Sequence, residues 1–197
     1  MLLFLFPPGV FSEQASAPAG PTAPRAGGSP APTPSDSRRT AGPAMPRSAP
    51  LRLTIPGIGV DAPFTGLEIG PSGALDPPPA DDTNLVGWHA SGTSPGERGT
   101  AVIAGHVDTA VAPAVFARLG ELSPGDRFHV RREDGTTATF VVDDTESFSK
   151  DDFPDERVYA DTPRAEARLI TCSGAYDRKA KDYTENLVVF AHLDTTA

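Results

Sequence analysis

Residues 127–143 read RFHVRREDGTTATFVVD, with two alternating segments on either side of Glu133-Asp134-Gly135. Polar and apolar side chains alternate within residues 127–132 and again within 136–143, as expected of strands that bury one face. An Asp-Gly pair between two such segments is a strong turn signal, because glycine adopts the positive φ that tight hairpin turns require. The stretch therefore predicts an antiparallel β-hairpin.

Outside this hairpin the chain continues as short strands separated by loops. Residues 100–105 (TAVIAG) form a continuous apolar run, which predicts a buried strand. Loops rich in Gly, Pro, Ser and Asp are expected at residues 70–83 and 90–98. Further strands are expected at residues 52–58, 60–69, 84–89, 167–172 and 186–192.

Helical signals are few. Residues 151–158 predict a short helical turn, and residues 113–122 predict a helix from apolar side chains at helical spacing, namely Val115, Phe116, Leu119 and Leu122. Many short strands with one or two short helices favour a mostly-β fold, a closed or nearly closed barrel, over a doubly wound α/β sheet.

The N-terminal quarter of the chain differs in composition from the rest. Residues 1–50 hold 11 of the 22 prolines, and residues 13–49 carry too few apolar side chains to offset the entropy of ordering. We therefore expect a disordered linker at 13–49 and a folded domain at 50–197. Residues 1–12 form a short apolar N-terminus, whose six leading apolar residues are too few for a bilayer that needs about 20. This segment is either the remnant of an anchor or signal, or an apolar end without a role.

Charge and cysteine content narrow the functional classes. The formal net charge of -9 offers no basic stripe for nucleic acid, so no nucleic-acid partner is expected. The single cysteine excludes an intrachain disulfide and a cysteine-rich metal site. The acidic pairs at 143–144 and 151–152 match no calcium-loop spacing, so we expect no metal and no cofactor.

Two residues stand out as candidates for chemistry because each leaves an apolar strand. Cys172 ends residues 167–172 and is followed by Ser173-Gly174, which predicts a thiol at the rim of the barrel. His106 follows the apolar run 100–105 in the same way. Taken singly, the cysteine fits inert burial and the histidine fits a hydrogen-bonded structural role. Together they supply a nucleophile and a base on strands that a barrel can bring side by side.

Several stretches together resemble the actinobacterial class F sortases. The region around His106 carries VGWHA at 86–90, Pro95-Gly96 and GTAVIAGHVD at 99–108. LITC at 169–172 is similar to the family's pattern around its cysteine. Residues 182–191 resemble the family's last strand and 53–64 its first two strands, so the resemblance spans roughly 50–193.

The resemblance implies an eight-stranded barrel and a cysteine transpeptidase, a hydrolase-class enzyme in that it cleaves a peptide bond. Cys172 would attack a Leu-Pro-x-Thr-Gly-like sorting signal of secreted surface proteins, and His106 would be its acid/base partner. The acyl group would then pass to an amine acceptor of a cell-wall precursor. The implied location is the bacterial cell surface, outside the cytoplasm, with membrane proximity through an N-terminal anchor that is not complete in this chain.

The family also uses an arginine, which binds substrate and stabilises the oxyanion. In many sortases it lies shortly before the Val-Val-Phe-like run, where this chain has Thr184-Glu185-Asn186. Arg178 is the one arginine after Cys172, and we assign it the role, with Lys179 and Lys181 as weaker substitutes. A guanidinium suits the task because it stays charged and donates several hydrogen bonds.

Two other functions remain open at this point. A cysteine peptidase of similar geometry would pass the acyl group to water. A non-catalytic surface interaction barrel would keep the scaffold without the chemistry, and the unusual position of the arginine favours it.

Overall fold

The structure, a computed structural model, describes residues 4–5, 43–71 and 73–194 of the 197-residue chain. The N-terminus predicted at 1–12 and the linker predicted at 13–49 therefore lie largely outside the described residues. The elements in chain order are β1 (Phe4–Leu5), β2 (Pro50–Ile55), η1 (Pro56–Ile58), β3 (Val60–Leu67), β4 (Ala74–Leu75), β5 (Val86–His89), β6 (Gly99–Gly105), η2 (Leu119–Glu121), β7 (Arg127–Arg132), β8 (Thr137–Ser149), η3 (Lys150–Asp152), α1 (Asp155–Tyr159), β9 (Ala165–Asp177) and β10 (Asp182–Leu193).

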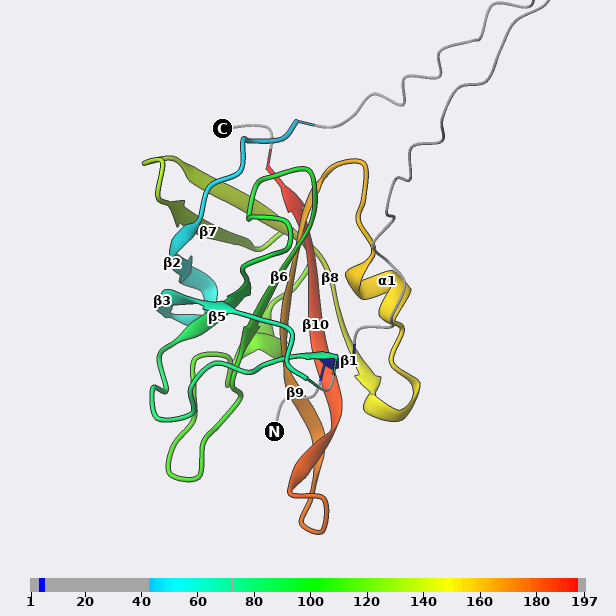
Figure 1. Cartoon of the computed structure of the whole chain (residues 1–197). Coiled ribbons are helices and arrows are strands. Elements are labelled where there is room, and N and C mark those ends of the chain that lie inside the picture. Colours follow the sequence, from blue (N-terminus) through cyan, green and yellow to red (C-terminus); the bar gives the residue numbers. More distant parts are fainter. Residues whose placement is uncertain (1–3, 6–42, 72, 195–197) are drawn as a thin grey trace, which may run out of the picture.

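Eight strands close into a barrel in the order β10-β8-β7-β2-β3-β5-β6-β9, and the expectation of a closed, mostly-β barrel is confirmed (Figure 1). The hairpin predicted from residues 127–143 is the β7–β8 pair, in which Phe128 lies opposite Phe140. Most neighbours are antiparallel, but β3 pairs with β5 and β6 pairs with β9 in parallel. β1 pairs with β4 in a separate two-stranded sheet.

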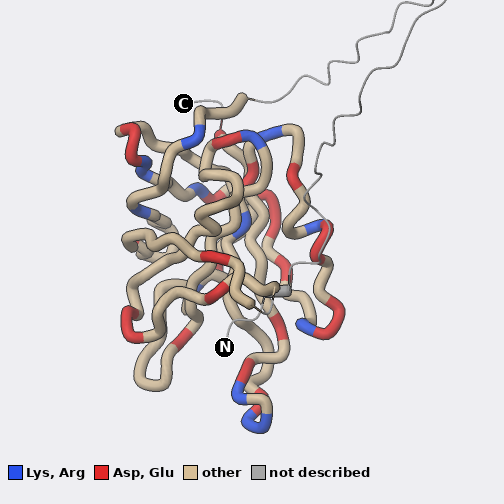
Figure 2. The backbone as a smooth tube through the Cα atoms, in the orientation of Figure 1, with Lys and Arg blue, Asp and Glu red and all other residues tan. Residues whose placement is uncertain are grey.

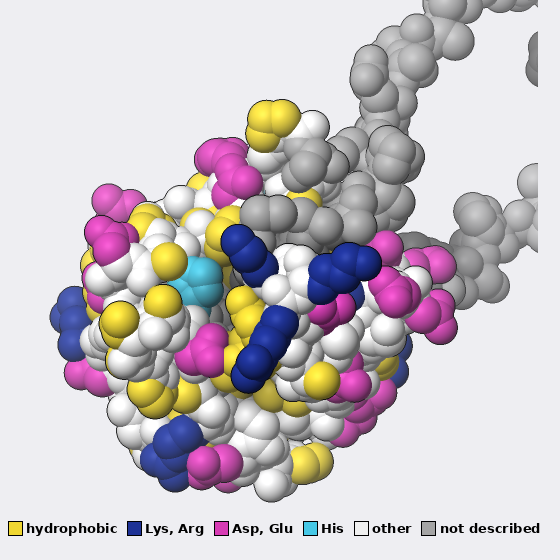
Figure 3. Space-filling model, turned by 90° about the horizontal axis from the view of Figure 1, so that it is seen from below, with side chains coloured by type: hydrophobic (Ala, Val, Ile, Leu, Met, Phe, Trp, Pro, Cys, Tyr) yellow, Lys and Arg dark blue, Asp and Glu magenta, His cyan; other side chains and the backbone are white. Residues whose placement is uncertain are grey.

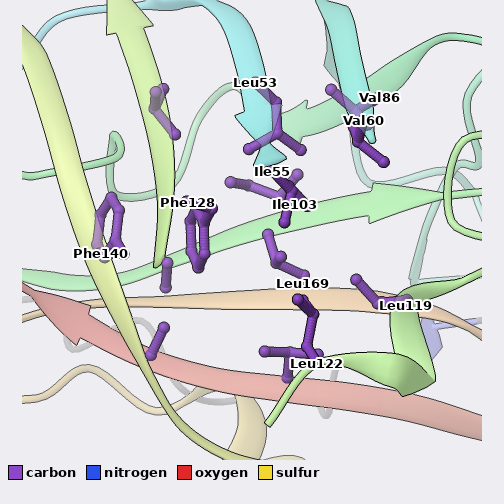
Figure 4. Close-up of a cluster of buried hydrophobic side chains, with 14 of the residues drawn as sticks. Leu53, Ile55, Val60, Val86, Ile103, Leu119, Leu122, Phe128, Phe140 and Leu169 are labelled. Atoms are coloured by element: carbon purple, nitrogen blue, oxygen red, sulfur yellow. The ribbon is translucent and has the colours of Figure 1, made fainter. Parts of the chain in front are cut away.

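The barrel interior holds the main hydrophobic core (Figure 4). Alternate residues of each strand point inward, so Leu53 and Ile55 of β2 meet Ile103 of β6 and Leu169 of β9. Phe128 and Phe140 stack with their ring centroids 5.0 Å apart, and both are fully buried. Burial of these large side chains is the main force that closes the barrel.

We predict that Phe128→Ala lowers the free energy of unfolding by about 3–5 kcal/mol, because it leaves a cavity beside Phe140 that the barrel cannot collapse to fill. That is a large share of the roughly 5–15 kcal/mol that stabilises an ordinary domain. Urea denaturation measures the change. Val111→Ala is the matched control, since Val111 is 90% exposed. A loss below about 1 kcal/mol for Phe128→Ala would mean that this ring is not part of a close-packed core.

A second apolar cluster lies on the outside of the barrel. The side chains that alternate with the core residues of β6, β9 and β10 point outward, yet they are also buried, and this is why residues 100–105 read as one continuous apolar run. One residue each from β3, β4 and α1 supplies the rest of this surface. The outer cluster, as we call it, consists of Leu67, Leu75, Val102, Ala104, Val158, Ile170, Cys172, Val188 and Phe190.

The helix predicted over residues 113–122 is wrong. Helical structure there is limited to η2, and tight turns precede it, with backbone N–H groups of Ala117 and Leu119 bonding three residues back. The segment also bonds to the chain end of β6, since the Phe116 N–H donates to the His106 carbonyl at 3.0 Å. The four apolar side chains are all buried in the core, so burial rather than helical repetition explains their spacing.

Residues 45–49, which precede the boundary predicted at residue 50, already contact the barrel. Arg47 donates to the carbonyls of Gly92 and Ala90 at 2.6 and 2.7 Å and stacks over Trp88 at 5.5 Å. The Met45 N–H donates to the Gly96 carbonyl at 2.8 Å. Composition did not reveal these bonds, because they are made by backbone groups and by one arginine rather than by apolar side chains.

Candidate active site

The pairing of β6 with β9 brings His106 and Cys172 to the same level. Ile103 pairs with Leu169 and Ala104 with Ile170, so two further steps in this parallel register set His106 beside Cys172. The Thr171 hydroxyl donates to the Gly105 carbonyl at 2.8 Å and ties the strands together at this point. Cys172 belongs to the outer cluster, and His106 follows the last residue of β6, Gly105. Continuation of the register therefore brings the two residues that the sequence paired to the same level of the barrel wall.

Cys172 differs from its prediction in one respect. β9 does not end there but continues to Asp177, and the thiol is 6% exposed among the outer cluster rather than free at a rim. Burial raises the pKa of the Cys172 thiol, while the charge of nearby Lys150 acts in the opposite direction. Lys150 Nζ lies 3.6 Å from Sγ.

His106 is half-buried, and its ring is held by backbone. Nε2 lies 2.8 Å from the carbonyl oxygen of Pro78. A carbonyl oxygen only accepts, so Nε2 carries the proton in this contact, and a neutral His106 then has its lone pair on Nδ1. The contact orients the imidazole, which is the role that a second partner plays for a catalytic base.

Sequence reasoning missed the contribution of Pro78. The proline-rich stretch 76–82 showed no chemistry by itself, yet it supplies the carbonyl that meets His106. The start of this stretch is anchored by β4, whose Leu75 is buried in the outer cluster, and by the Asp76 N–H, which donates to the Glu68 carbonyl at 3.0 Å. A rigid run of prolines with free carbonyls was the available signal.

Two further polar residues border the thiol. Tyr183 donates its hydroxyl to Asp108, two residues after His106, and this bond is the main reason that the pKa of Tyr183 is raised to about 12. Asn186 pairs directly with Cys172 across β9 and β10 and is 2% exposed. Among the described residues its Oδ1 atom is buried with no hydrogen-bond partner. A buried acceptor of this kind is suited to an N–H group from a bound molecule.

Arg178, the predicted third member, is not brought to the thiol. It lies exposed in the turn between β9 and β10, beyond the Asp177–Asp182 pair that closes the hairpin. Asp177 lies five residue steps beyond Cys172 on β9, which corresponds to about 17 Å at 3.3 Å per residue. Figures 1 and 2 show this hairpin projecting beyond the barrel, with basic residues at its tip.

The surface at the end of the barrel from which the β9–β10 hairpin projects is hollowed. Viewed from below, hydrophobic side chains line a hollow with a histidine and Lys or Arg side chains at its edge (Figure 3).

Within residues 4–5, 43–71 and 73–194, no group of three or more His, Cys, Asp or Glu side chains could hold a metal ion. No helix in the same described ranges is long and apolar enough to cross a membrane.

Comparison with known proteins agrees with this architecture. The sortase domain model matches residues 53–194, and the chain belongs to the sortase family. Sortases are cysteine transpeptidases that act on cell-wall sorting signals at the bacterial surface, so this chain is an enzyme of that class. None of the curated proteins matches this chain.

Solved structures with the same fold include sortases of classes A and C. Sortase C-1 of Actinomyces oris is 23% identical with a TM-score of 0.57, and the match covers 74% of this chain and 73% of that one. A lid mutant of sortase A from Corynebacterium diphtheriae is 21% identical with a TM-score of 0.57, over 76% and 72% of the two chains. Sortase C1 of Streptococcus agalactiae, in a complex with MTSET, is 21% identical with a TM-score of 0.55, over 74% and 67%. At these identities the likeness concerns the fold.

Proposed function

We propose that this sortase, with a class F-like sequence, cleaves a Leu-Pro-x-Thr-Gly-like sorting signal and transfers it to an amine of a cell-wall precursor. Cys172 is the nucleophile and His106 the acid/base. The observation that carries the proposal is the β6–β9 register, which sets these two residues side by side at the edge of the outer cluster. The cluster offers an apolar surface suited to the Leu and Pro side chains of such a peptide.

The chemistry proceeds through a thioester. His106 takes the thiol proton, and the Cys172 sulfur adds to the threonine carbonyl carbon. The Thr–Gly C–N bond then breaks as His106 returns the proton to the leaving nitrogen. The acceptor amine adds to the thioester carbon and gives a proton to His106. The C–S bond breaks, and the thiolate recovers that proton.

The local structure supports this sequence of steps in three ways. Burial raises the thiol pKa, so a base beside Cys172 is needed to form the thiolate at neutral pH. The Pro78 carbonyl orients the His106 ring. The free Oδ1 of buried Asn186, directly across from Cys172, suits a backbone N–H of an extended substrate.

The cellular setting follows from the substrate. A sorting signal is met outside the cytoplasm, so the enzyme would work at the cell surface, close to the membrane. Arg178 as the oxyanion cation stays a prediction, which the activity of Arg178→Ala tests.

A product assay tests the proposal. The protein is incubated with a Leu-Pro-x-Thr-Gly peptide, with and without an added amine such as triglycine, and products are identified by mass. We expect a Thr-amine product that forms only with the amine. Release of the free threonine acid at the same rate in both samples would instead identify a peptidase. Absence of either product, and of any acyl-enzyme, would favour a non-catalytic barrel.

A further inference from the structure

The thioester mechanism needs a positive charge beside the sulfur, and the chain lacks one at the position expected from the family. The residues before the Val188-Val189-Phe190 run are Thr184, Glu185 and Asn186. Thr184 accepts a hydrogen bond from the Ala175 N–H, which holds the hairpin rather than a substrate. Arg178 lies in the hairpin turn.

A lysine from another part of the chain occupies the space instead. β10 lies between β8 and β9, and its Glu185 pairs with Ser149 on one side and with Ser173 on the other. Lys150 follows Ser149 immediately, so its backbone lies near the level of Cys172, with β10 between the two residues. The Ser149 hydroxyl accepts from the Asp151 N–H at 3.3 Å and caps η3, which turns the chain at this point.

Lys150 is held between two groups. Its Nζ lies 3.6 Å from Cys172 Sγ and 2.8 Å from Asp182 Oδ2. The Lys150 side chain is 15% exposed and that of Asp182 is 21% exposed, so water screens this pair less than it screens a surface ion pair. Fixing a long lysine side chain in one place costs free energy. A lysine that is held in a largely covered position by an ion pair with Asp182 is therefore suited to a specific role beside the thiol.

We propose that Lys150 is a catalytic residue whose ammonium donates to the Cys172 sulfur and then to the oxyanion of the tetrahedral intermediate, with Asp182 as its positioning residue. The inference rests on the proposed function and deepens it. The oxyanion forms on the carbon that bonds to Sγ, so a donor already in contact with Sγ is within reach of it. Lys150 stays protonated throughout, and proton transfer is left to His106.

The electrostatics around the thiol agree with this geometry. Burial raises the pKa of Cys172, Lys150 lowers it, and Asp182 raises it. The other titratable groups at the site are His106, level with the thiol, and Tyr183, which bonds to Asp108. Removal of the Lys150 ammonium should therefore raise the pKa of the Cys172 thiol further, and less thiolate should form at a given pH.

The test uses the full chain with Lys150→Met, which keeps the stem and removes the charge, and Lys150→Arg, which keeps the charge. The double variant Lys150→Met/Asp182→Asn also removes the negative charge of the carboxylate whose ion-pair partner was Lys150. Arg131→Met, which removes a charge at an exposed position of β7, is the matched control. For each protein we measure kcat and KM for peptide transfer, and the pH dependence of Cys172 alkylation by iodoacetamide.

We expect Lys150→Met to lower kcat by about 10²–10³-fold, the usual cost of one oxyanion donor, with KM little changed. Lys150→Arg should recover part of the rate, and the double variant should stay slow. The alkylation midpoint should move to higher pH in Lys150→Met. Arg131→Met should match the wild type in both measurements.

Two results would overturn the inference: a Lys150→Met enzyme within threefold of wild type with an unmoved alkylation midpoint, or a loss of rate in Arg178→Ala that Lys150→Met does not share. Failure of the proposed function looks different. A wild-type protein that transfers no peptide removes the transpeptidase proposal, while the alkylation midpoint still decides whether Lys150 acts on the Cys172 sulfur.

Discussion

Cys172→Ala should form no acyl-enzyme and no transfer product. Alanine has no atom that can add to a carbonyl carbon, and Cys172 is the one cysteine in the chain, so no second thiol can replace it. Intact mass after incubation with the sorting peptide is the direct measurement. The wild type should gain the mass of the peptide acyl group, and the variant should keep its own mass.

A structural effect of this substitution must be separated from a chemical one, because Cys172 is buried in the outer cluster. Cys172→Ser keeps nearly the same shape and should be equally inactive, since a hydroxyl is far less ionised than a thiol at neutral pH. Ser173→Ala, one residue further along β9, is the control that should retain activity. An acyl adduct on Cys172→Ala would show that another side chain is the nucleophile, and the site assignment would fail.

His106→Ala should slow peptide transfer by about 10²–10⁴-fold, the range that general acid–base catalysis usually contributes. His106 is the histidine that the β6–β9 register brings level with Cys172, whereas His129 lies on β7 and pairs with Thr139 of β8. Single-turnover kinetics at several pH values measures the loss in the acylation step itself.

His106→Gln distinguishes proton transfer from orientation. A glutamine amide can still donate to the Pro78 carbonyl, but it cannot act as a general acid or base at neutral pH. If His106 acts as acid and base, the glutamine variant should be about as slow as the alanine variant, while His129→Gln should be normal. Near-normal turnover of His106→Ala would move the role to His89 or His192.

The local pattern of the chain was sufficient for the strands and for the class of fold. Alternation in residues 127–143 is a property of the pleat and needs no knowledge of distant residues, so the β7–β8 hairpin follows directly from it. Residues 113–122 show where such reasoning fails. Their apolar spacing fits a helix, but they pack against the barrel as tight turns, since tertiary burial rather than periodicity selects their conformation.

The candidate site likewise contains some residues that the sequence identified and some that only the fold brings in. Residue types and the family resemblance singled out Cys172 and His106, and their positions on β9 and after β6 follow from strand patterns. Contacts across the barrel could not be read from any pattern, because they depend on strand order and register. Pro78 meets His106 across 28 positions of sequence, and Lys150 meets Cys172 across 22.

Side-chain alternation and residue chemistry are local, so they predicted a closed or nearly closed β-barrel with a cysteine and a histidine at the ends of two separate strands. Tertiary structure alone decided that the thiol is buried, that a proline carbonyl holds the imidazole, and which cation stands beside the sulfur. Arg178 is nearer to Cys172 along the chain than Lys150 is, but β9 and β10 carry it away in an extended hairpin, while insertion of β10 beside β8 brings Lys150 to the nucleophile.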